Sequence, residues 1–279
     1  MYQSWSIENQ FEAFAAWGYD GAELAPFALA TEPNATRPNE TPLDRIDAAT
    51  RLRILNASRN TGVAVAGLHW ILARASGFHL NDPDFDTRRR TSEYLARLAE
   101  FCAELGGEYM VLGSPAQRRV AEGRAYDDAV ACALETIEAV LPTLDKVGVT
   151  LALEPLAPTE TNFWVNSEET LDFIAKLGAP ERVKLHLDCK AMHGGEYQAI
   201  DDVIRRVAQT HRCVSFHAND PNLQGPGFGA LNFAPIMQAL VETGFNGWIG
   251  VEPFDYSPGI VELGRESLRN LKKALQTNS

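Results

Sequence analysis

Four side chains that can bind a metal ion stand at the ends of four successive β-rich runs of the sequence. They are Glu154, Asp188, His217 and Glu252, separated by 34, 29 and 35 residues. Three carboxylates and one imidazole suit a divalent cation such as Mn²⁺, Mg²⁺ or Co²⁺, whereas zinc with thiolate ligands is not indicated. A single acid at a strand end is more often a solvated loop residue or a helix cap, but four in register predict a metal site.

The residues two positions before each of these four share a face of the strand with them, because side chains alternate along a β-strand. Three are small and the fourth is a histidine: Ala152, His186, Ser215 and Gly250. We therefore expect His186 to lie beneath the ligands and to hydrogen-bond one of them, which would fix its orientation. The alternative is a core histidine that is satisfied by unrelated groups.

The elements that must position these residues alternate along the chain. Short runs rich in apolar and β-branched residues are each followed by a longer segment with helical spacing, which is typical of a parallel sheet covered by helices. The runs occupy residues 21–27, 63–70, 108–113, 149–154, 183–188, 213–217 and 248–252. With no linker between them, they predict a single (β/α)₈ TIM barrel over residues 1–279, whose strand ends converge on one mouth. A doubly wound sheet is the competing fold, but no G-x-G-x-x-G motif follows the first run.

The first strand of this barrel is predicted to be short or truncated. Only residues 1–5 precede the first helical segment, and they are few for a barrel strand. We expect either a short strand made by these residues or a longer chain upstream, and a weak seam between the first and last of the seven runs. Residues 31–45, polar and with three prolines, are predicted to form a long loop at the catalytic end.

Composition excludes several other classes of protein. The 279 residues are 45% hydrophobic and 22% charged, with a net charge of −12 and a pI of about 5.0. An acidic chain is poorly suited to the phosphate backbone of nucleic acids. The four cysteines form no C-x-x-C pair, the N-terminal residues do not resemble a signal peptide, and no apolar stretch approaches the roughly 18 residues of a membrane helix. We therefore expect a cytoplasmic protein that binds neither nucleic acid nor a membrane.

Two further side chains are expected near the mouth. His69 ends the run at residues 63–70 and could bind a substrate hydroxyl with Trp70 packed against a wall, although a buried structural histidine fits as well. Arg118 follows the run at residues 108–113 and could hold a phosphate or carboxylate. A surface arginine that pairs with the many acids of the chain is the alternative.

Four motifs resemble the sugar-phosphate isomerase/epimerase family, the xylose-isomerase-like barrels: ALEPLAPTETNF, HLDCKAM, FHANDPNLQGPGFG and GWIGVEPFDY. Similarity to its ketose 3-epimerase branch implies that Glu154 and Glu252 are both metal ligands and the acid/base pair. It implies that Asp188 and His217 complete the ligand set. Glu160 matches a glutamate that contacts the substrate in that branch. The family also implies one divalent metal ion (Mn²⁺, Mg²⁺ or Co²⁺) and a homodimer or homotetramer.

The sequence departs from the ketose 3-epimerase pattern at two positions. Where that branch has a histidine after the aspartate ligand, this chain has Ala191, and where it has an arginine after the histidine ligand, this chain has Leu223. Both missing groups grip the substrate near the reacting carbonyl, so a simple free ketohexose is in doubt. Lys190 or His193 is a candidate replacement for one of them, and a solvated loop side chain is the alternative for each.

The function indicated is a metal-dependent isomerase or epimerase that acts on a ketose, sugar acid or sugar phosphate. Its chemistry removes a proton next to a carbonyl and returns it through an enediolate, with two carboxylates as base and acid. A lyase or dehydratase of the inosose type, which expels a β-hydroxyl after the same first step, is one alternative. A non-catalytic sugar-binding barrel is another. The DNA-cleaving endonuclease IV branch is disfavoured because it needs more histidines at strand ends and a basic groove.

Overall fold

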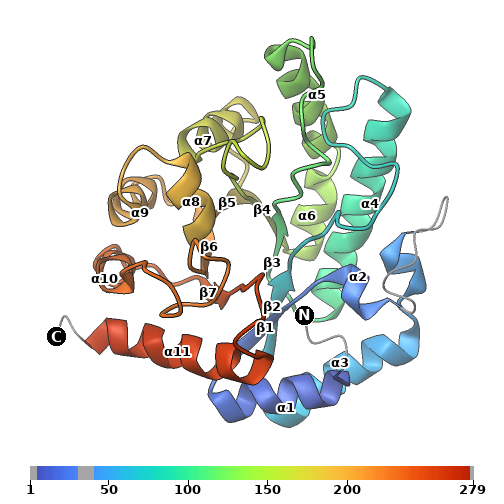
Figure 1. Cartoon of the computed structure of the whole chain (residues 1–279). Helices are drawn as coiled ribbons and strands as arrows, with labels where there is room; N and C mark the ends of the chain where they lie inside the picture. The colour runs from blue at the N-terminus through green and yellow to red at the C-terminus, as the bar shows by residue number, and fades with distance from the viewer. Residues whose placement is uncertain (1–4, 31–40, 277–279) are drawn as a thin grey trace.

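A parallel sheet of seven strands runs through the residues that the computed structural model describes, 5–30 and 41–276. The strands follow one another in sequence order, so each pairs with the next along the chain, and the sheet curls into a nearly closed barrel (Figure 1). The strands are β1 (Gly21–Leu24), β2 (Ala64–Leu68), β3 (Tyr109–Leu112), β4 (Thr150–Leu153), β5 (Val183–Asp188), β6 (Cys213–Ala218) and β7 (Trp248–Val251). The fold is therefore the predicted TIM barrel.

Helices surround this barrel as an outer layer, and at least one follows every strand (Figure 1). They are α1 (Ile7–Trp17), α2 (Pro26–Leu29), the 3₁₀ helix η1 (Pro42–Arg45), α3 (Ala48–Thr61), α4 (Phe85–Glu104), α5 (Tyr126–Glu138), α6 (Leu141–Val147), α7 (Ser167–Lys176), α8 (Cys189–Gly195), α9 (Ile200–Ala208), α10 (Phe233–Glu242) and α11 (Ile260–Gln276). None of the described helices combines the length and apolar character that a bilayer crossing needs.

The seam of the barrel lies between β1 and β7, which are the two ends of the described sheet. The first element described is α1. The short first strand was predicted on residues 1–5, of which residues 1–4 lie outside the described residues and Trp5 lies in a bend. Trp248 of β7 reaches across the seam to β1. A Cβ atom on Gly21 would lie 2.6 Å from its ring, so glycine is required at that position for the indole to fit.

The barrel interior changes from apolar to polar along its length. Ala66, Tyr109, Val111 and Ala152 form a buried cluster against which Trp248 packs. Every residue of β3 and β4 is buried, as expected for parallel strands covered on both faces. The acidic and imidazole side chains lie beyond this cluster, at the carboxyl ends of β4 to β7, which is the end where TIM barrels carry their active sites.

Candidate metal centre and active site

Three of the four predicted ligands meet at the mouth of the barrel. Asp188 ends β5, His217 lies at the end of β6, and Glu252 directly follows β7, so the parallel register brings them together. One potential ligand atom from each lies within 4.8 Å of the others, and all three side chains are buried. This geometry can hold a divalent cation with mixed oxygen and nitrogen ligands.

Glu154, the fourth predicted ligand, lies beside this trio without belonging to it. It follows β4, is 8% exposed, and its carboxylate accepts no hydrogen bond from the described residues. Burial raises the pKa of Glu154 well above its usual value, and the charges of Asp188 and Glu252 raise it further. The side chain is therefore within electrostatic reach of the trio and uncommitted to other partners.

The two ring nitrogens of His217 have different partners. Nδ1 lies 3.0 Å from Glu252 Oε2 and 4.0 Å from Asp188 Oδ2, so this nitrogen faces the candidate metal position. Nε2 lies 2.6 Å from Oε2 of Glu23, a partly buried carboxylate of β1 that also accepts a hydrogen bond from the Tyr109 hydroxyl. A carboxylate behind a ligating histidine fixes the ring orientation and the tautomer. The sequence analysis did not identify Glu23, although it lies in the first β-rich run.

Glu252 is held by groups on both of its oxygens. Oε1 accepts a hydrogen bond of 2.6 Å from Trp70 Nε1 and lies 3.0 Å from His69 Nδ1, while Oε2 faces His217. Burial alone would raise the pKa of Glu252, but the positive charge on His217, its hydrogen bond and those from His69 outweigh it and hold the pKa well below its usual value. His69, predicted near the mouth, therefore lies against a predicted ligand.

Asp188 is oriented by the start of α8 and by a buried amide. Its Oδ1 accepts from the backbone N–H of Ala191 at 2.7 Å, and its Oδ2 accepts from Asn219 Nδ2 at 2.6 Å. Burial and the charge of Glu252 raise the pKa of Asp188 to about 6. Asn219 was missed by the sequence analysis, although its place directly after β6, two residues after His217, was an available signal.

His186 lies beside His217, and its hydrogen bond goes to Ser215 and not to a predicted ligand. Its Nδ1 is 2.7 Å from Ser215 Oγ, not from a ligand, and its ring centroid lies 4.1 Å from that of His217 in an edge-on arrangement. The side chain is fully buried, which lowers its pKa well below the usual value, and the charge of His217 lowers it further. His186 therefore contacts His217 by ring packing, and its Nε2 has no hydrogen-bond partner among the described residues.

Arg118 is buried behind Glu154 and not at the surface of the mouth. It is 1% exposed, Nη1 donates to the Glu154 carbonyl oxygen at 2.6 Å, and the guanidinium lies 5.2 Å above the Trp164 ring. Burial lowers its pKa to about 10 in spite of the nearby Glu154. Nε and Nη2 have no hydrogen-bond partner among the described residues. The position fits a group that secures the end of β4 better than one that meets a substrate phosphate.

Lys190 and Glu160, both predicted to contact substrate, are paired with each other at the mouth. Lys190 Nζ lies 2.7 Å from Glu160 Oε1 and 4.9 Å above the ring of Phe254. Glu160, Asp188 and Glu154 together raise the pKa of Lys190 above its usual value although burial opposes them. His193 is exposed on α8 and takes part in none of these contacts.

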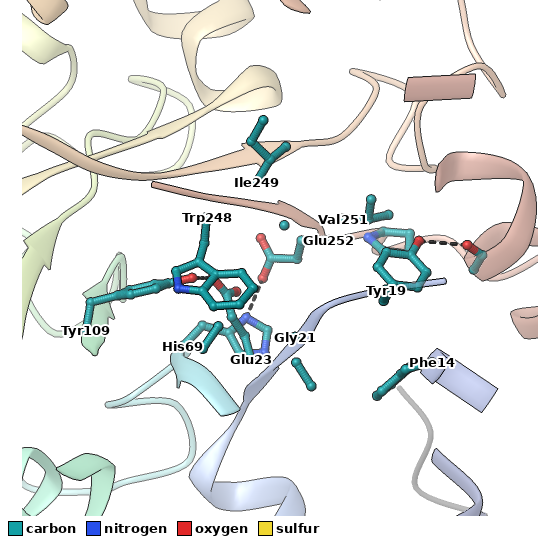
Figure 2. A pocket seen from close by; sticks show the side chains of 15 residues that line it. Phe14, Tyr19, Gly21, Glu23, His69, Tyr109, Trp248, Ile249, Val251 and Glu252 are labelled. Atoms are coloured by element: carbon teal, nitrogen blue, oxygen red, sulfur yellow. Dashed lines mark hydrogen bonds and ion pairs between the residues drawn. The ribbon is translucent and has the colours of Figure 1, made fainter. Parts of the chain in front are cut away.

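A cavity of about 110 Å³ lies at the seam, below the ligands (Figure 2). Glu23 and Tyr109 face one another there, and His69 and Glu252 border the same space. The donor set fits a cation. Glu154 and Asp188, whose pKa values are raised, and Glu252 are three buried carboxylates that repel one another, and a divalent ion between them would relieve this repulsion.

Comparisons with known proteins agree with this architecture. A stretch of 129 residues aligns at 30% identity with a D-psicose 3-epimerase of Enterocloster bolteae. It spans 46% of this chain and 42% of that protein. The structure of apo 3-keto-D-glucoside 4-epimerase, YcjR, from E. coli matches with a TM-score of 0.79 at 17% identity, over 96% of this chain and 94% of that one. IolI protein with a bound zinc atom matches with a TM-score of 0.69 at 16% identity, over 97% and 91%.

The two structural likenesses, at such low identity, speak for the fold alone. A family model extends further, because the model of the xylose isomerase-like TIM barrel matches residues 11–274. That span includes all seven strands and every residue of the site described above. The chain therefore belongs to the xylose isomerase-like TIM barrel family.

Proposed function

We propose that the chain is a divalent-metal-dependent sugar isomerase or epimerase that acts on a ketose, sugar acid or sugar phosphate through an enediolate. The observation that carries this proposal is the meeting of Asp188, His217 and Glu252 within 4.8 Å, with the buried carboxylate of Glu154 beside them. The names of the relatives, which include two sugar epimerases, support the same class of reaction.

Asp188, His217 and Glu252 would hold the metal, with Glu154 as a fourth ligand. The IolI relative with a zinc atom supports a metal in this fold, and the oxygen-rich donor set here favours Mn²⁺, Mg²⁺ or Co²⁺. When bound, such an ion polarises a substrate carbonyl and lowers the cost of charge on its oxygen. Asp188 and His217 act as ligands only, because Asn219 and Glu23 already hold their remaining polar atoms.

Glu154 and Glu252 are the groups that remove and return the substrate proton. They follow β4 and β7, which are separated by two strands around the barrel, so they approach a substrate carbon from different sides. Trp70 and His69 orient one oxygen of Glu252. The carboxylate of Glu154, which accepts no bond from the described residues, is available to hold a proton. Lys190 and Glu160 bind substrate hydroxyls at the rim.

Product analysis in D₂O tests this proposal. Metal-free protein is prepared with a chelator, reloaded with Mn²⁺, and incubated with a panel of ketoses and sugar acids, and the products are identified by NMR. We expect activity only in the reloaded protein, and deuterium at one product carbon. A product that has lost water would instead identify the dehydratase. Full activity in metal-free protein, or a product without solvent deuterium, would contradict the two-glutamate mechanism.

We further propose a homodimer or homotetramer in the cytoplasm, with residues 1–279 as one domain. The four cysteines of the chain are free, which supports a reducing compartment. Light scattering on the purified protein measures the oligomeric state, and a monomer at micromolar concentration would contradict this part of the proposal.

A further inference from the structure

A groove leads from the metal centre toward the outside of the barrel. It has a volume of about 650 Å³ and runs between α1, α2 and the loops that follow β2 and β7. Its inner end is bordered by Glu23 and His69, and its outer end by Thr50 and Arg53 of α3. Because His69 contacts Glu252, the groove is continuous with the site of chemistry. Pockets of roughly 300–1,000 Å³ enclose drug-sized ligands, so a single six-carbon sugar fills only part of it.

One wall of the groove is aromatic. The ring of Trp70 lies between those of Phe27 and Phe254, with centroid separations of 5.8 and 6.0 Å, and Tyr256 continues the wall. Trp70 is 41% exposed although it lies next to a buried site. Aromatic side chains offer an apolar surface, and sugar rings present apolar C–H faces that pack against such surfaces. The wall therefore suits a sugar ring that is not itself held by the metal.

The backbone of Trp70 indicates that this wall is under functional constraint. Its φ is 52°, in the left-handed region that bulky residues avoid, so this backbone conformation is strained. The conformation directs the indole Nε1 to Glu252, while the ring stacks on Phe254 and packs at a tilt against Phe27. Strain of this kind persists where the surrounding structure holds it, and it concentrates at functional sites. The wall is therefore rigid and joined to a catalytic carboxylate.

The charged side chains along the groove each contact other residues of the chain. The Arg53 guanidinium at the outer end is held by both oxygens of Glu8, each at 2.8 Å. The Arg74 guanidinium lies 4.7 Å from the Phe27 ring and so forms part of the wall. On the other side of Phe254, the pair of Lys190 and Glu160 makes a polar rim. The mouth thus has a polar side for hydroxyls and an apolar side for an uncharged ring.

We propose that the substrate is a ketose that carries a second, uncharged sugar ring, and that this ring lies in the groove against the wall of Phe27, Trp70 and Phe254. This inference rests on the proposed function, because the ketose end of the substrate occupies the metal centre. It names the substrate class as glycosylated ketoses and not free monosaccharides.

A matched pair of substrates tests the inference on the Mn²⁺-loaded protein. Isomaltulose and maltulose are D-fructose with a glucosyl group on O6 or O4, and D-fructose is their common monosaccharide. We expect kcat/KM for at least one disaccharide to exceed that for fructose by about tenfold or more, the smallest effect that one apolar group usually has in a pocket. Isothermal titration calorimetry of the same sugars gives binding independently of turnover.

A blocking variant locates the effect. Ala28 lines the groove from α2 and is exposed, so Ala28→Trp fills the groove without disturbing the core. This variant should reduce the ratio of kcat/KM for the disaccharide to that for fructose to about threefold or less. Val241→Trp, at a position 65% exposed on α10, is the control that adds the same side chain far from the site, and it should keep the advantage.

The outcomes separate the inference from the proposed function. If fructose or fructose 6-phosphate is converted as well as or better than both disaccharides, the inference is wrong and the proposed function stands. If no sugar is converted, the proposed function is wrong, and calorimetry decides the inference. The inference is supported if a disaccharide binds more tightly than fructose and Ala28→Trp abolishes this difference. It is overturned if disaccharides and fructose bind equally.

Discussion

Replacing Glu23 by glutamine should weaken metal binding while the barrel stays folded. Glu23 lies 2.6 Å behind the Nε2 atom of His217, and glutamine keeps an acceptor of the same size without its charge. Hydrogen bonds to charged groups contribute about 1.5–3 kcal/mol and neutral ones about 0.5–1.5 kcal/mol, so the loss is about 1–1.5 kcal/mol. Since 1.4 kcal/mol is a factor of ten, metal affinity should fall by about tenfold.

Glu23→Leu should have the larger effect. It removes both acceptors and leaves the Tyr109 hydroxyl and the His217 ring without their shared carboxylate partner. Loss of such an outer-shell partner typically costs about 10–100-fold in metal affinity. Calorimetric titration of Mn²⁺ into metal-free protein measures the affinity, and circular dichroism monitors folding. Glu262→Gln, an exposed carboxylate on α11, is the matched control. Wild-type affinity in both folded Glu23 variants would refute the role assigned to this carboxylate.

Four further predictions concern catalysis and stability. Glu154→Gln should lower kcat by about 10²–10⁴-fold. Bound metal is measured in the same sample to separate loss of the base from loss of the ion. Normal activity in this variant would exclude Glu154 as a base. Cys102 and Cys189 should resist a thiol reagent in the native protein because burial raises the pKa of both thiols, for Cys102 to about 12; labelling before unfolding would contradict this. Because those raised values favour the neutral thiol in the folded state, stability should fall as the pH rises from about 9 to 12, which melting temperatures would reveal. Arg53 lowers the pKa of Glu8 to about 2, so the contribution of Glu8 to the free energy of unfolding should be present above pH 4.5 and lost as the pH falls toward 2. If the melting temperature of Glu8→Gln followed the same acid profile as that of the wild type, this contribution would be contradicted.

Much of the fold could be predicted because the relevant signals are local. Strand and helix periodicities are visible within windows of a few residues, and their alternation implies a parallel barrel. The convergence of Asp188, His217 and Glu252 followed from the same alternation, because parallel strands present their carboxyl ends on one side. The small residues beneath them and the position of His186 followed from the two-residue period of a strand.

The partners of these residues could not be predicted, because they come from distant segments. Glu23 and His217 are 194 residues apart, and Trp70 and Glu252 are 182 apart, so no local pattern connects them. The burial of Arg118 behind Glu154 and the pairing of Lys190 with Glu160 depend in the same way on how loops from different strands pack.

The sequence by itself determined the order of strands and helices, because each has its own spacing of apolar residues. It also determined the chemical types of the groups at the strand ends, because these are the residue identities. The tertiary structure decided which of those groups meet, which are held by neighbours, and which carboxylate stands apart. It also decided that an aromatic groove opens beside the candidate metal centre. The physical reason is that burial and charge–charge contact act through space, and the curl of the sheet alone brings β1 near β6 and β7.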